Sequence, residues 1–173
     1  MVNFSEGSFS VNFGFVTLGG KLSEEDRQCA WELYTELCTR ISVTGKQKDE
    51  KCENFDGEIF VQSLDSLYTF FQELRGIMRK FPVGRLKRND KYHLGILINN
   101  IIRDVLRPFL EKWQSDFRHW YEYESNKKLP PFERQSKYPK LKEFLSDWTN
   151  LRLVMRELQR TLTKKYKLVR ISQ

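Results

Sequence analysis

Small or polar residues alternate with apolar ones near the start of the chain. From Ser8 to Leu18, apolar residues at every second position predict a β-strand, which Gly19 and Gly20 end. The backbone of a strand needs a hydrogen-bonding partner. This partner is either the tail at 167–171 or the same strand of another copy. Pairing between copies would make the protein a homo-oligomer.

Most of the remaining chain follows a helical pattern, with apolar residues three and four positions apart. The pattern predicts helices over about 23–45, 57–81, 89–123 and 139–165. Polar or proline-containing segments at 46–54, 82–88 and 125–136 separate them. Pro108 lies within the third helix and is expected to kink it. The predicted fold is therefore mainly α: an antiparallel four-helix bundle with a short N-terminal β-strand.

Aromatic residues follow the same helical spacing and are assigned to the core. Tyr68 and Phe71 belong to the buried side of the second predicted helix. The alternative for the aromatic residues of the third helix is base stacking beside Arg118. These residues are Trp113, Phe117, Trp120, Tyr121 and Tyr123.

The length of 173 residues suits one domain with a substantial core. We expect an N-terminal arm over 1–20, a helical bundle over 21–165 and a C-terminal tail over 166–173. No window approaches 18 uninterrupted apolar residues, and Met1 does not lead into a basic segment followed by an apolar run. The sequence thus predicts a cytoplasmic protein without a transmembrane segment. Its three cysteines form no CxxC pair, which argues against structural zinc.

The formal net charge of +7 favours an acidic partner, either RNA or an acidic protein. On the last predicted helix, four basic residues are spaced four apart; we call them the basic stripe. Like charges at this spacing repel each other unless an anion lies between them. The stripe and the basic residues near the end of the second helix form a candidate binding surface, or else a solvated face paired with acidic neighbours. The stripe contains Arg152, Arg156, Arg160 and Lys164, and the other basic residues are Arg79, Lys80, Arg85 and Lys87.

The segment from Arg88 to His93 carries the strongest candidate chemistry. If Asn89 or Asp90 caps the third helix, His93 falls in the first turn, where the helix dipole favours a neutral imidazole that can act as a base. Arg88 could bind a phosphate, and RNA supplies its own 2′-hydroxyl nucleophile, so no metal or cofactor is required. The alternative is an ordinary helix cap with Arg88 and Lys91 in solvent.

This segment resembles the motif of the HEPN superfamily, in which Arg, often followed by Asn, precedes His by four to six residues. The resemblance implies a helical bundle and metal-independent RNA cleavage at a site shared by two protomers. Arg88 and His93 would then be catalytic, and Asn89 would support them.

Other segments look like those of HEPN-like accessory proteins of type VI-B CRISPR loci. They are Trp31-Glu32-Leu33-Tyr34, Leu106-Arg107-Pro108-Phe109-Leu110 and Lys112-Trp113. The expected function is therefore that of a HEPN-like accessory or effector of bacterial antiviral defence, which either binds RNA or cleaves it as a metal-independent endoribonuclease. The alternative is a non-enzymatic module that oligomerises and docks an acidic partner through a basic helix face.

Overall fold

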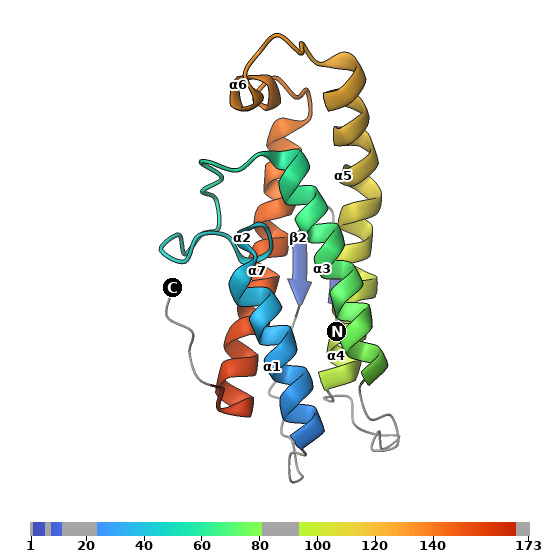
Figure 1. Cartoon of the computed structure of the whole chain (residues 1–173), viewed down its shortest axis with the longest axis vertical. Coiled ribbons are helices and arrows are strands. Elements are labelled where there is room, and N and C mark those ends of the chain that lie inside the picture. Colours follow the sequence, from blue (N-terminus) through green and yellow to red (C-terminus); the bar gives the residue numbers. More distant parts are fainter. Residues whose placement is uncertain (1, 6–7, 12–23, 81–93, 169–173) are drawn as a thin grey trace.

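The protein is mainly helical, and its long helices run along one common axis (Figure 1). The computed structural model describes residues 2–5, 8–11, 24–80 and 94–168. The long elements are α1 (Glu24–Thr39), α3 (Phe60–Lys80), α4 (Leu94–Ile101), α5 (Arg107–His119) and α7 (Leu141–Tyr166). The short ones are α2 (Ile41–Thr44), α6 (Pro131–Gln135) and the π-helical segments η2 (Ile102–Leu106) and η3 (Trp120–Glu124).

The long helices enclose a single core. Helix α1 packs against α3 and α7, and α5 packs against the same two helices from the other side. The buried side chains come from all of these helices and are rich in aromatic rings. Phe144 lies at the centre, with ring centroids of Trp113, Phe117 and Trp148 within 5.0–5.3 Å. The two helices predicted over 57–81 and 139–165 correspond closely to α3 and α7.

The first predicted helix is interrupted before Gly45. Helix α1 ends at Thr39, and Arg40 adopts an extended conformation with φ −114° and ψ 99°. The short helix α2 follows and ends at Thr44, and Gly45 directly after it has a φ of 68°. Four of the five residues from 39 to 44 that flank Arg40 are β-branched, and such residues lower helix propensity, which favours a break at this place.

The third predicted helix contains π-helical turns as well as α-helix. The N–H of Arg107 donates to the carbonyl of Ile102, five residues earlier, just before Pro108. Proline has no N–H for the preceding turn, and η2 accommodates this change in hydrogen bonding. A second turn of this type ends where Ser125 N–H donates to Trp120 O at 2.9 Å. A π-helical segment therefore lies just before Pro108, the residue at which the sequence predicts a kink.

Most members of the aromatic run on the third helix are core residues. Trp113, Phe117 and Trp120 are at most 8% exposed. Tyr123 is different, because 75% of its surface is exposed at the end of η3.

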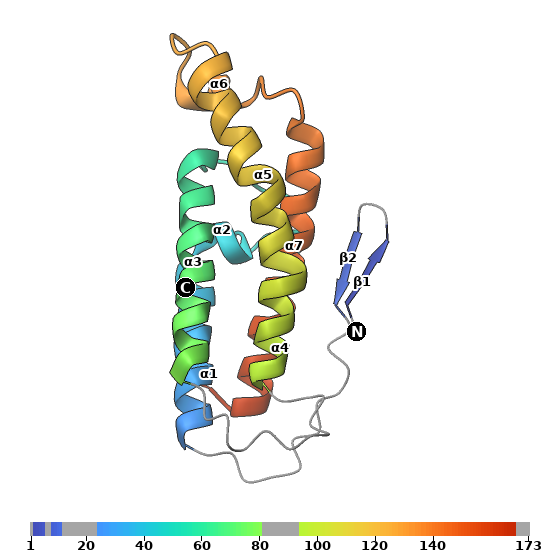
Figure 2. The same ribbon diagram turned by 90° about the vertical axis from the view of Figure 1, so that its right-hand side faces the viewer.

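A β-hairpin precedes the helices. Strands β1 (Val2–Ser5) and β2 (Ser8–Val11) pair antiparallel, with Phe4 opposite Phe9. The hairpin lies beside α7, and Figure 2 shows it outside the layer of helices. The partner of Ser8–Val11 is thus the segment just before it, and neither of the two predicted partners. Residues 12–18 of the predicted strand and most of the tail at 167–171 lie outside the described residues.

Within the described ranges, no helix combines the length and the apolar character that crossing a bilayer requires.

Candidate nucleic-acid interface

The predicted catalytic residues Arg88, Asn89 and His93 lie outside the described residues, as do Arg85 and Lys87. Their segment joins the end of α3 at Lys80 to the start of α4 at Leu94. These two helices are neighbours. Two predicted site residues at the end of α3 are described: Arg79 and Lys80 are both exposed, and Lys80 pairs with Glu32 of α1 at 3.2 Å.

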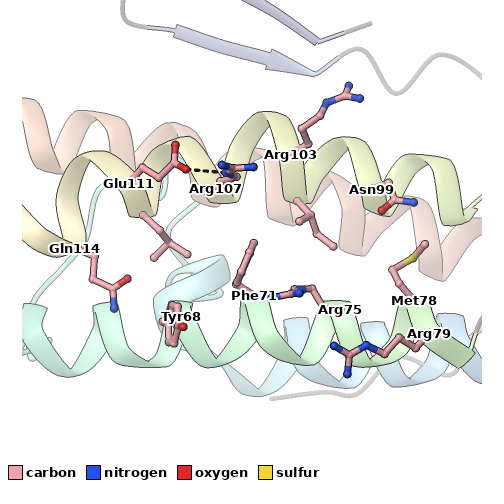
Figure 3. A pocket seen from close by; sticks show the side chains of 12 residues that line it. Tyr68, Phe71, Arg75, Met78, Arg79, Asn99, Arg103, Arg107, Glu111 and Gln114 are labelled. Atoms are coloured by element: carbon pink, nitrogen blue, oxygen red, sulfur yellow. Dashed lines mark hydrogen bonds and ion pairs between the residues drawn. The ribbon is translucent and has the colours of Figure 1, made fainter.

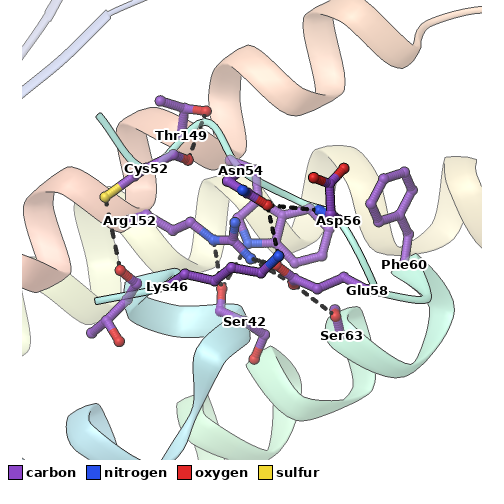
Figure 4. Close-up of polar contacts among 12 residues, drawn as sticks. Ser42, Lys46, Cys52, Asn54, Asp56, Glu58, Phe60, Ser63, Thr149 and Arg152 are labelled. Carbon is purple, nitrogen blue, oxygen red and sulfur yellow. Dashed lines mark hydrogen bonds and ion pairs between the residues drawn. The ribbon is translucent and has the colours of Figure 1, made fainter. Parts of the chain in front are cut away.

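Arg152 is not a surface residue, which corrects the prediction of a continuous basic stripe. Its side chain is fully buried. Nη2 donates to both carboxylate oxygens of Glu58, at 2.7 and 2.6 Å (Figure 4). The guanidinium also lies 4.1 Å from the ring centroid of Phe55. Burial lowers the pKa of Arg152, and the pairing with Glu58 opposes this shift. Arg152 therefore belongs to the interior.

Arg156 is also buried, with 7% of its surface exposed. Its guanidinium donates to the backbone carbonyls of Thr44, Lys46 and Asp49. A side chain that satisfies these three carbonyls, at the end of α2 and in the loop after it, holds the loop in place and is not available to a partner. The alternative of a solvated face is also wrong for Arg152 and Arg156. Of the stripe, only Arg160 and Lys164 are exposed.

The burial of Arg152 could have been predicted from its position on the helix, although the spacing of the charges suggested a surface residue. Arg152 follows Trp148 by four positions and Leu151 by one, and both of these are fully buried. A residue at this place on the helix lies within the apolar stripe. Glu58, its partner, is distant in sequence and could not be paired with it from periodicity.

A groove runs between α3 and the opposite wall formed by α4, η2 and α5 (Figure 3). It encloses about 1000 Å³. Its lining combines aromatic, cationic and amide side chains. These are Tyr68, Phe71, Arg75, Met78, Arg79, Asn99, Ile102, Arg103, Arg107, Leu110, Glu111 and Gln114.

Arginines line both walls of the groove. Arg75 and Arg79 stand one helical turn apart on α3, and neither has an ion pair within the part of the chain that the structure describes. On the opposite wall, Arg103 pairs with Asp104 at 2.5 Å and Arg107 with Glu111 at 2.7 Å. The cations of the α3 wall are thus the more available ones. Figure 3 shows the guanidinium of Arg75 between the walls, while Arg103 extends outward from the rim.

Tyr68 corrects an expectation from periodicity, whereas Phe71, also in the groove, packs against the core as expected. Tyr68 is 42% exposed, and Phe71 is half-buried. Their rings are stacked, with centroids 6.3 Å apart and planes 23° apart. The guanidinium of Arg75 lies 5.8 Å from the centroid of Phe71. One face of α3 therefore presents a flat aromatic surface followed by two cations, at spacings of three and four residues.

One end of the groove is bridged. Asp65, one turn before Tyr68, forms an ion pair with Arg118, one turn after Gln114. This contact joins α3 to α5 beside the aromatic pair. The other end, at Arg79 and Asn99, lies toward the ends of α3 and α4 that the segment 81–93 connects.

The described residues contain no cluster of His, Cys, Asp or Glu side chains that could hold a metal ion. The groove side chains can bind anions and stack on flat rings.

No family model, curated protein or solved structure matches this chain. Function is therefore inferred from the geometry of the groove and from the motif at 88–93.

Sequence reasoning missed most of the groove. Of its cations it named only Arg79, and it placed Tyr68 and Phe71 in the core. Positions 68, 71, 75 and 79 do share one face of a helix, and this spacing is visible in the sequence. Nothing in the sequence indicated that Arg103 and Arg107 would line the opposite wall.

Proposed function

We propose that this protein binds single-stranded RNA in the groove between α3 and α5. The observation that carries the proposal is the placement of Arg75 and Arg79, which have no ion pair among the described residues, next to the stacked and partly exposed rings of Tyr68 and Phe71. Guanidinium groups bind phosphates, and exposed aromatic rings stack on unpaired bases. A groove with both features suits a single strand better than a duplex, whose bases are already stacked on each other.

The wider proposal is that of a HEPN-like accessory or effector of bacterial antiviral defence, built as an antiparallel four-helix bundle. The groove leads toward the ends of the two helices joined by 81–93, the segment that contains Arg88 and His93. RNA held along α3 would thus be directed toward the motif. In this proposal, Arg88 binds the scissile phosphate, supported by Asn89, and His93 moves the proton. One histidine serves as base or acid but not as both at once, so cleavage would need a second copy of the chain.

A binding measurement tests the groove. We expect Arg75→Ala with Arg79→Ala to weaken binding of a labelled single-stranded RNA by at least about tenfold, because charge-assisted hydrogen bonds to phosphate are lost. The slope of log K against log salt should fall by about 1.4, from about 0.7 per lost contact. Fluorescence anisotropy at several salt concentrations measures both.

The matched control is Arg160→Ala with Lys164→Ala, which removes the same charge from an exposed part of α7 outside the groove. If both double variants weaken binding equally, RNA follows net charge and the groove is not the site. If the protein binds a poly-glutamate peptide but no RNA, the alternative function is supported, namely a non-enzymatic module that docks an acidic protein.

A further inference from the structure

At the end of the groove that the Asp65–Arg118 ion pair bridges, the side-chain amide of Gln114 is in a position to contact a base. Gln114 is half-buried on α5, in the same groove as Tyr68 of α3. Figure 3 shows its side chain extending toward α3 at the Tyr68 end. Within the described residues, the carboxamide of Gln114 makes no hydrogen bond, whereas Arg118 on the next turn is paired with Asp65.

We infer that Gln114 reads the edge of a base stacked on Tyr68, and that the preferred base is adenine. The inference rests on the proposed binding of single-stranded RNA. The Tyr68 ring provides a face for stacking, and every base has such a face, so stacking by itself selects none. A carboxamide at the edge of the stacked base presents one donor group and one acceptor.

This pairing of groups matches adenine. The N7 edge of adenine offers the N6 amino group as a donor and N7 as an acceptor, and a Gln side chain can bind both at once. On the same edge guanine offers two acceptors, and uracil and cytosine have no N7, so only adenine offers both groups there. Glu111, also in the groove, accepts a hydrogen bond from Arg107 at 2.7 Å and is thus engaged. The Asp65–Arg118 ion pair joins α3 to α5 at this end of the groove. It therefore fixes the position of the part of α5 that carries Gln114.

The test compares short labelled homopolymers of A, C and U with the whole protein. We expect the wild type to bind oligo(A) more tightly than oligo(U), by about tenfold for one bidentate contact. Gln114→Ala should reduce binding of oligo(A) to the level of oligo(U). Gln114→Glu, which has acceptors only, keeps an acceptor for N6 but loses the donor for N7, so the preference for oligo(A) over oligo(U) should also fall. The control is Ser115→Ala, an exposed neighbour outside the groove.

The outcomes separate the two proposals. If the wild type binds no homopolymer, RNA binding itself fails. If it binds all three and Gln114→Ala leaves their ratios unchanged, RNA binding stands and base reading by Gln114 is overturned. If Gln114→Ala weakens all three equally while its melting temperature is unchanged, Gln114 contacts the backbone and the inference is likewise overturned. Selective loss of oligo(A) binding supports it.

Discussion

Arginine performs two separate roles in this protein, and the environment of each side chain decides which one. Arg152 is fully buried, and its Nη2 donates to both carboxylate oxygens of Glu58. Its Nη1 has no hydrogen-bond partner among the described residues. Arg75 lines an open groove. A buried guanidinium contributes to stability only while its carboxylate is present, whereas an exposed one is available to bind an anion.

Arg152→Ala should lower the free energy of unfolding by about 3–5 kcal/mol, because it leaves the Glu58 carboxylate buried and unpaired. Replacing both partners, as Arg152→Met with Glu58→Gln, should restore most of this loss, since no buried charge remains. Urea denaturation measures both variants. A double variant as unstable as Arg152→Ala would contradict the assigned cause.

At the scale of elements, the loop between α2 and α3 is held by α7. Arg156 donates to the carbonyl of Thr44, the last residue of α2, and to those of Lys46 and Asp49 in the loop. Arg152 reaches Glu58 at the far end of the loop. Gly45 starts the loop with a φ of 68°, and a Cβ there would lie 3.3 Å from Cδ of Arg152. Glycine suits position 45 because it adopts this positive φ without strain and leaves room for the Arg152 side chain.

Arg156→Ala should loosen this loop locally. Hydrogen bonds from a charged donor contribute about 1.5–3 kcal/mol each, and their loss leaves three carbonyls to be satisfied by water. Amide exchange in residues 46–58 should accelerate markedly while exchange in the middle of α3 stays slow. Arg160→Ala, on the exposed side of the same helix, serves as the control. Unchanged exchange in Arg156→Ala would show that the loop holds its shape without this contact.

At the scale of the whole molecule, the ring of helices places residues far apart in sequence on the walls of one groove. Tyr68 and Arg75 come from α3, and Arg107 and Gln114 from α5. The same arrangement brings the end of α3 close to the start of α4. The groove and the segment with the candidate catalytic motif are thus adjacent along the chain.

The cleavage proposal is tested with the two histidines of the chain. The purified protein should cleave single-stranded RNA in EDTA, and His93→Ala should abolish cleavage without changing the melting temperature. His119→Ala is the matched control, because His119 is 65% exposed on α5 and pairs with Glu124 at 3.2 Å. Cleavage that persists in His93→Ala would remove this residue from the mechanism and leave an RNA-binding protein without nuclease activity.

Periodicity predicted the helical class and two of the long helices closely, because burial along a helix recurs every three to four residues. It was less accurate at Arg40 and around Pro108, where backbone conformation depends on local hydrogen bonding. The spacing of the basic residues, and not the apolar periodicity, led to Arg152 and Arg156 being placed on the surface. Charge spacing indicates which basic residues repel each other. It does not indicate which buried acceptors, such as Glu58, the fold places next to them.

The sequence by itself determined that this chain is mainly helical, which positions form most of its apolar core, and that it contains the Arg-Asn-x-x-x-His motif. Only the tertiary structure decided which arginines are paired inside and which line a groove, and that Tyr68 is accessible beside Gln114. The physical reason is that helix formation and apolar burial depend on neighbours within a few residues. Ion pairs and grooves instead depend on the packing of helices that lie tens of residues apart in the chain.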